Sequence, residues 1–69
     1  MNPLHKARLA AGLTAWELAQ AARTREPRIY AFERERYRPR ADEAQRIAVA
    51  LGHEVEDLFP EGFNERGRR

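Results

Sequence analysis

Apolar residues recur at helical spacing from the start of the chain onward, in short segments bounded by helix start and stop signals. Asn2 followed by Pro3 is typical of a helix start, because asparagine is a good N-cap and proline is tolerated at the first helical position. Gly12 is a natural stop. The pattern therefore predicts a first helix over residues 3–11.

The second segment carries a more specific start signal. Thr14 and Glu17 have the spacing of a capping box, in which each side chain accepts the backbone N–H of the other residue. Leu13 and Leu18 have the spacing of a hydrophobic staple across this cap. A second helix with a small, alanine-rich interior is expected over residues 15–22.

The third helix must begin close to Pro27, because proline is tolerated in the first turn of a helix but not deeper. The residue before a proline resists the helical conformation, so Glu26 is expected as the N-cap. Ile29 and Phe32 are expected to face inward. The positions expected to be exposed are Arg28, Tyr30, Ala31, Arg34 and Glu35.

Two further helices are expected after a basic loop at residues 36–40. Apolar residues at i, i+3, i+4 and i+7 spacing predict a helix over residues 41–51, and Gly52 ends it. A short helix is expected within residues 55–59. No segment shows the alternation of a strand.

The length of 69 residues and the absence of cysteine exclude several classes of protein, among them disulfide-bonded domains and thiolate metal proteins. A chain of this size forms one domain, which buries about 60% of its unfolded surface and leaves no room for an enzyme cleft. Without cysteine there are no disulfides or thiolate metal sites. We expect an all-α domain over residues 1–60 and a flexible C-terminal tail over residues 61–69, which lack periodicity.

Charge is sorted along the chain. Residues 23–41 carry seven arginines against three glutamates, whereas residues 42–65 carry seven acids against one arginine. A basic segment beside an acidic one indicates one face that meets a polyanion, while the other stays in solvent or meets a basic partner. The alternative is that arginine is simply the preferred surface cation, since the chain has twelve arginines and one lysine.

The sequence offers no convincing catalytic, cofactor or metal site. His5 and His53 lie at opposite ends of the chain, and the acids beside His53 are typical of a helix start. Apolar runs are far shorter than the roughly 20 residues that span a bilayer, and no secretory signal opens the chain. We expect a cytoplasmic protein that is not an enzyme, with no cofactor, no metal and no membrane partner.

Five short helices, with the second and third joined by a short break, are typical of a helix-turn-helix domain. Four blocks carry a closer likeness: RLAAGLTAWELA (8–19), Ile29 with Phe32 and Glu33, RPRADEAQRIAVALG (38–52), and VEDLF (55–59). Together they resemble the lambda-repressor-like family of bacterial and phage regulators, of the Cro/repressor (Xre) type. The resemblance implies a compact five-helix domain that binds double-stranded DNA.

The resemblance also implies that the third helix lies in the major groove. The base-reading positions of the family correspond to Glu26, Pro27, Arg28 and Ala31, with Tyr30 beside them. Arg28 is suited to guanine O6 and N7, and Glu26 to cytosine N4. Ala31 or Pro27 can only touch a thymine methyl group.

Phosphate contacts are expected around this helix, from the first-turn amides of the second helix and from the arginine-rich stretch. The expected phosphate-binding residues are Thr14, Trp16, Arg23, Arg25, Arg34, Arg36, Arg38 and Arg40. The resemblance further implies a structural ion pair between Arg8 and Glu33, which ties the first helix to the end of the third.

Two departures from the family pattern fall at the start of the second helix. Ala15 stands where a phosphate-clamping glutamine is usual, so that contact is lost. Trp16 replaces a solvated glutamate and is expected at the edge of the DNA-facing surface. Its ring then lies against sugar-phosphate, packs on a partner protein or folds back over the first helix.

Two further departures replace glycines. Arg23 stands in the turn between the second and third helices, where it costs about 1 kcal/mol if φ is positive. Glu35 stands after the third helix, which suggests that this helix continues to Arg36 or Tyr37.

Two functions fit these features. The first is a sequence-specific, repressor-like transcriptional regulator that dimerises on DNA, with Phe59, Phe63 and the face of the fifth helix as candidate dimer contacts. The second is a protein-protein interaction module, or an antitoxin-type partner, that keeps the fold with weak or no base reading. Its partner would bind through Trp16 or the acidic C-terminal half.

Overall fold

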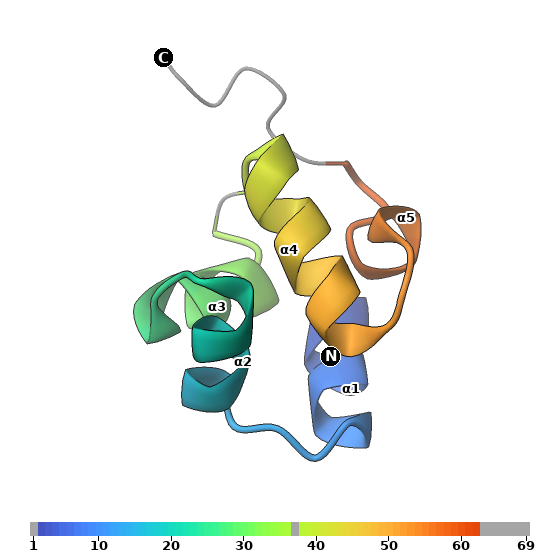
Figure 1. Ribbon diagram of the computed structural model, residues 1–69. Helices are drawn as coiled ribbons and strands as arrows, with labels where there is room; N and C mark the ends of the chain where they lie inside the picture. Colours follow the sequence, from blue (N-terminus) through green and yellow to red (C-terminus); the bar gives the residue numbers. More distant parts are fainter. Residues whose placement is uncertain (1, 37, 63–69) are drawn as a thin grey trace.

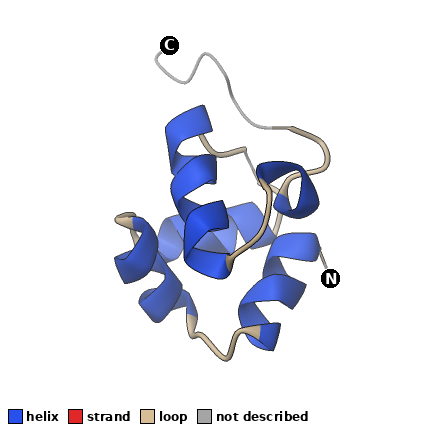
Figure 2. Cartoon of the chain, turned by 45° about the vertical axis from the view of Figure 1, so that its right-hand side comes forward, coloured by secondary structure: helices blue, strands red, loops and turns tan. Residues whose placement is uncertain are grey.

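Five α-helices make up the computed structural model, which describes residues 2–36 and 38–62 (Figure 1). They are α1 (Pro3–Ala10), α2 (Ala15–Ala22), α3 (Glu26–Glu33), α4 (Ala41–Leu51) and α5 (Val55–Leu58). Short loops join them, and no strand occurs among the described residues (Figure 2). None of the described helices is long and apolar enough to cross a membrane. The predicted all-α fold is confirmed, whereas most of the expected tail lies outside the described residues.

The helices pack around one core, and α4 contributes one face to it. In Figure 1, α2 and α3 lie on one side of α4, and α1 and α5 lie on the other. α2 packs against both α3 and α4. Ala15, Ala19 and Ala22 are buried on α2, and these small side chains let neighbouring helices approach closely.

Asn2 holds together two helices that are distant in sequence. Its side-chain oxygen accepts the amide of His5 at 2.9 Å and so caps α1, as the sequence predicts. Its side-chain nitrogen donates to the carbonyl of Phe32 at 3.0 Å, near the end of α3. The start of α1 is thereby tied to the end of α3.

The predicted capping box of α2 is present. The amide of Glu17 donates to the Thr14 hydroxyl at 3.0 Å, and the amide of Thr14 donates to the Glu17 carboxylate at 2.9 Å. The helix therefore begins at Ala15 as expected.

Each helix contributes to the hydrophobic core. Its largest fully buried hydrophobic side chains are those of Leu4, Leu18, Ile29 and Ile47, one each from α1 to α4, and α5 adds Leu58. The core therefore fixes how α3 sits against the rest of the domain.

Phe59 closes the core next to α5. Its ring meets that of Phe32 edge-on, with 6.4 Å between the ring centroids, and Phe59 is buried. The expectation that Phe59 offers a dimer contact is therefore wrong, because its surface is used inside the domain. Phe63, another candidate, lies outside the described residues, and a contact through the face of α5 stays a prediction.

Helices α2, α3 and α4 end in the same way. Arg23, Glu35 and Gly52 follow them in the left-handed conformation, with φ of 57°, 60° and 72°. In each case the next amide donates to the carbonyl five residues earlier: Thr24 to Ala19 at 2.9 Å, Arg36 to Ala31 at 2.9 Å and His53 to Ala48 at 3.0 Å. These are Schellman-type ends, which favour glycine at the left-handed position.

The observed first and last residues of α3 both differ from the predicted ones. The helix stops at Glu33 and does not continue to Arg36, because Glu35 adopts the conformation that a glycine would supply. At the other end the N-cap is Arg25, in an extended conformation, and not Glu26. Pro27 can occupy the first turn with one helical residue before it.

Candidate nucleic-acid interface

The turn between α2 and α3 consists of Arg23, Thr24 and Arg25. The two arginines are exposed, whereas Thr24 is half-buried and donates its hydroxyl to Oε2 of Glu43 at 2.8 Å. This hydrogen bond attaches the turn to α4. Two packed helices joined by such a turn define a helix-turn-helix, with α3 in the position of the recognition helix.

The exposed side of α3 forms a shallow depression lined by both polar and apolar residues. Tyr30 is 39% exposed, and the Arg34 guanidinium lies over its ring at 5.7 Å from the centroid. Ala31 was expected to be exposed but is 8% exposed and so presents little surface. The residues that line the depression are Glu26, Pro27, Tyr30, Ala31, Arg34 and Arg36.

Arg28, which was expected to reach guanine, is committed to a carboxylate of the protein itself. Its Nε donates to Oε2 of Glu43 at 2.6 Å, and its Nη2 donates to Oε1 at 2.7 Å. The guanidinium also lies 5.3 Å from the centroid of the Phe32 ring. The side chain therefore spans from α3 to α4 in the DNA-free protein.

Two opposing effects act on the pKa of the Glu43 carboxyl. Burial raises this pKa, but the hydrogen bonds from Arg28 and Thr24 lower it by more, so the pKa lies below its usual value. Glu43 was counted in the sequence only as one acid of the C-terminal half. The sequence does place Glu43 in the first turn of the predicted helix over residues 41–51. No sequence pattern, however, indicates which residue of α3 lies opposite it.

The implied ion pair between Arg8 and Glu33 is present. The Arg8 Nε donates to Oε2 of Glu33 at 2.6 Å, and the pKa of Arg8 is raised chiefly by this hydrogen bond. The Nδ1 atom of His5 lies 2.9 Å from Oε1 of the same carboxylate, a contact that the sequence did not indicate. The last residue of α3 is therefore held by two side chains of α1.

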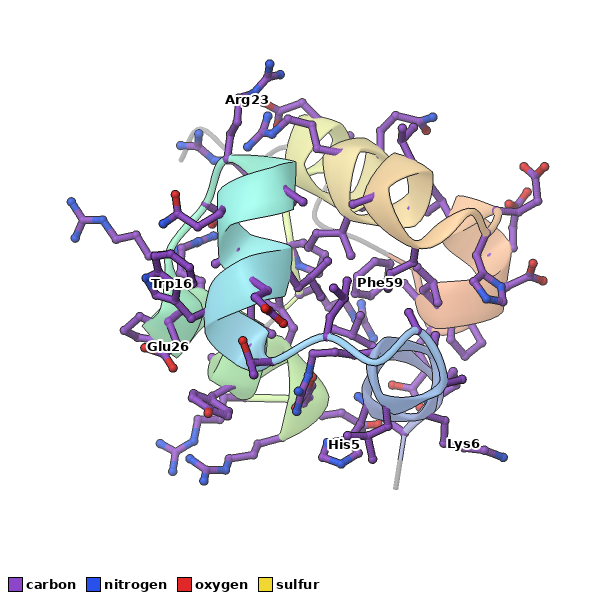
Figure 3. The ribbon with its side chains drawn as sticks, turned by 60° about the horizontal axis from the view of Figure 1, so that its bottom comes forward. His5, Lys6, Trp16, Arg23, Glu26 and Phe59 are labelled. Atoms are coloured by element: carbon purple, nitrogen blue, oxygen red, sulfur yellow. The ribbon has the colours of Figure 1, made fainter. Side chains whose placement is uncertain are left out.

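Trp16 is 57% exposed, so its ring does not fold back over α1. Figure 3 shows Trp16 and Glu26 on the same side of the molecule, with Lys6 on the opposite side. Thr14, just before Trp16, is exposed and uses its hydroxyl as the helix cap. The start of α2 therefore presents an open aromatic ring near the exposed side of α3.

The arginines after α3 form a band and not a single cluster. Arg34 and Arg36 line the depression on α3. Arg36 and Arg38 line a neighbouring hollow of about 340 Å³ beside α5, and Arg40 borders a third one with Arg28. All four of residues 34, 36, 38 and 40 are exposed at their side chains. The two hollows that hold Arg34, Arg36 and Arg38 share Arg36, and Arg40 lies separately, just before α4.

Part of the acidic half is used for local structure. Asp42 pairs with Arg46 at 3.1 Å, and the Asp57 carboxylate accepts the Glu54 amide at 3.3 Å as the cap of α5. Glu43 is buried. The acidic surface available to a partner is therefore smaller than the sequence suggests.

The two histidines lie apart. His5 contacts Glu33, and His53 is exposed with its Nδ1 3.9 Å from the Asp57 carboxylate. Among residues 2–36 and 38–62, no three histidine or acidic side chains come together as a metal-binding group would require.

The helix-turn-helix geometry and the arginine band define the class of protein: a DNA-binding helix-turn-helix domain. A family model for helix-turn-helix proteins of the Cro/repressor type matches residues 4–58. The chain therefore belongs to this lambda-repressor-like (Xre) family of DNA-binding regulators. No curated protein and no solved structure matches the chain.

Proposed function

We propose that the protein is a sequence-specific transcriptional regulator that inserts α3 into the major groove and represses by occupying its site. The observation that carries this proposal is the exposed face of α3, which stands between an exposed helix start at Trp16 and a band of arginines. A helix is about 10–12 Å wide and the major groove about 12 Å, so one helix fills it.

The arginine band supports contacts to the phosphates on either side of the groove. Arg34 and Arg36 border the same depression as the reading face, and Arg23 and Arg25 project from the turn before it. Arginine binds phosphate through a planar fork of donors, and such contacts fix the register of the protein on DNA.

Glu26 and Tyr30 are the polar side chains proposed to read bases, with Pro27 as an apolar contact. Glu26 can accept from cytosine N4, and Pro27 can meet a thymine methyl group. A single domain with so few reading groups binds weakly, so we propose that two copies occupy adjacent half-sites and associate on DNA.

A salt titration tests whether the protein binds duplex DNA through these cations. We expect the affinity for a labelled random-sequence duplex to fall linearly on a double-logarithmic plot between about 50 and 200 mM salt, with a slope of about −0.9 for each phosphate contact. Arg36→Ala should flatten the slope by about one unit. Lys6→Ala removes the same charge on the opposite side and should leave the slope unchanged.

Selection of preferred duplexes from a random pool tests sequence reading and half-site spacing together. Enrichment of a motif in two copies about 10 base pairs apart would support reading by a pair of domains. A pool that stays random after selection, from a protein that still shows the steep salt slope, would contradict sequence specificity and leave DNA binding in place.

A second function is favoured by one observation, the 57% exposure of Trp16. An exposed tryptophan at the start of a helix is suited to a protein partner, and the domain would then be an interaction module or the antitoxin of a toxin pair. A flat salt response in the titration would favour this function over the first.

A further inference from the structure

Arg28 occupies a position that faces DNA in this family, yet its guanidinium is held by the protein. The two hydrogen bonds to Glu43, at 2.6 and 2.7 Å, use Nε and Nη2 in a bidentate arrangement. This is the geometry in which arginine binds a carboxylate most strongly. Arginine can bind guanine through the same kind of two-donor edge, so the Nε/Nη2 edge that holds Glu43 is not available to a base in this state.

Glu43 cannot easily give up this partner. Its side chain is 5% exposed, whereas that of Arg28 is 36% exposed. The carboxylate of Glu43 also accepts from the Thr24 hydroxyl at 2.8 Å and from the Arg40 amide at 3.5 Å, and both of these donors are neutral. Removal of the guanidinium would leave the buried carboxylate without the cation that pairs with it, which is strongly unfavourable.

The contact joins α3 and the turn before it to α4. Arg28 belongs to the first turn of α3, Thr24 to the turn before it, and Glu43 to the first turn of α4. The guanidinium also rests over the Phe32 ring, at 5.3 Å from its centroid. One carboxylate therefore fixes the orientation of the part of α3 that would enter the groove.

We propose that Arg28 is a positioning residue and not a base-reading one, and that Glu43 withholds its guanidinium from the bases. The inference rests on the proposed function, since it concerns how α3 is presented to DNA. Base reading is then left to Glu26, Pro27 and Tyr30. Glu43 determines specificity without touching DNA.

Base preferences, selected from a random pool, test which residue reads. Arg28→Ala in the native protein should lower the affinity for all duplexes by a similar factor and leave the preferred bases unchanged. Glu43→Gln removes the charge that holds Arg28 and keeps the shape of the side chain. It should add a preference for guanine at one position of each half-site, by about 5- to 150-fold. The double variant Arg28→Ala/Glu43→Gln should lose this added preference.

Thermal unfolding without DNA tests the positioning contact itself. The loss in melting temperature for Arg28→Ala and Glu43→Gln should not be additive, because both variants break one contact. Arg28→Lys can form a single hydrogen bond to Glu43, so it should recover part of both the stability and the affinity. It also serves if Arg28→Ala fails to fold.

The outcomes separate this inference from the proposed function. Loss of a guanine preference in Arg28→Ala or Arg28→Lys, with the other preferences intact, would overturn the positioning role, as would additive losses in stability. If the native protein binds no duplex, the proposed function fails, and the stability measurements alone then decide whether Arg28 and Glu43 form a positioning pair.

Discussion

The Nε atom of Arg8 in α1 lies 2.6 Å from Oε2 of Glu33, the last residue of α3, and the two side chains are 9% and 4% exposed. Arg8 also donates Nη1 to the carbonyl of Leu13 at 2.9 Å, so one guanidinium holds α1, the loop before α2 and α3 together. The far end of the recognition helix is thereby fixed to a helix that does not take part in the proposed interface.

Removal of either partner of this pair should destabilise the domain severely. Arg8→Ala leaves the Glu33 carboxylate buried without its cation, and such a loss costs about 3–5 kcal/mol. The whole domain is expected to have only about 3–10 kcal/mol of stability. Thermal unfolding should therefore show a transition that is absent or strongly lowered. Lys6→Ala, a change of the same charge at an exposed site of α1, is the control and should unfold like the native protein.

Glycine at the two left-handed positions should stabilise the fold but affect DNA binding in opposite ways. Arg23 and Glu35 have φ of 57° and 60°, where a side chain is disfavoured, so Arg23→Gly and Glu35→Gly should each add about 0.5–1 kcal/mol. Arg23→Gly removes a cation from the proposed interface and should weaken duplex binding. Glu35→Gly removes a negative charge beside Arg34 and Arg36 and should strengthen it.

Chemical denaturation and the salt titration measure these two effects separately. Equal changes in DNA affinity for both glycine variants would contradict the proposed electrostatic role of this surface. A loss of stability in both would mean that the left-handed turns are stabilised by their side chains and not strained by them.

The native protein should lose more stability in acid than Glu43→Gln. The pKa of Glu43 is lowered below its usual 4.5 in the folded state, with burial opposing and the hydrogen bonds from Arg28 and Thr24 favouring the ionised form. The unfolded chain therefore binds more protons, so this stabilisation is present above about pH 4.5 and is lost as the pH falls through the folded pKa.

Melting temperatures of both proteins between about pH 7 and pH 3 check this prediction. The pKa of Asp42 is also lowered, mainly by its hydrogen bond from Arg46, and this group is common to both proteins. The difference between the two curves thus isolates Glu43. Parallel curves would show that its ionised form is not selectively stabilised by folding.

Trp16 should report directly on the approach of DNA. It is the one tryptophan of the chain and is 57% exposed, so its fluorescence in the free protein should be quenched readily by acrylamide. Duplex DNA at saturation should reduce this quenching, because the ring lies on the same side as Glu26. Unchanged quenching in a complex that anisotropy shows to be formed would place Trp16 outside the interface.

Local signals in the sequence predicted the helices well. Helix starts and stops are set by hydrogen bonds between residues that are close in sequence, so they can be read locally. Examples are Asn2 with Pro3, Thr14 with Glu17, and Gly52. The bounds of α2 and α4 follow directly. The predicted end of α3 was wrong because Glu35 adopts the left-handed conformation, which glutamate disfavours. Only the folded structure shows that it does so.

Tertiary contacts of the candidate site were harder to predict. The Arg8–Glu33 pair came from the resemblance to a family, which carries such contacts with it. The resemblance did not include the Arg28–Glu43 pair. This pair joins side chains that are 15 positions apart in the sequence, and it forms only because of how α3 packs relative to α4. An arginine at an exposed helical position therefore looked like a reading group until its neighbour was known.

Glu43 lies in α4, outside the helix that is proposed to meet DNA, yet its carboxylate holds the guanidinium of Arg28 in α3. Exchange of this one carboxylate for an amide would redirect the protein to different operators while its recognition helix stayed the same. Related regulators could then differ in DNA specificity through substitutions in α4 as well as in α3. Target sites that are inferred from the sequence of the recognition helix alone would be assigned incorrectly.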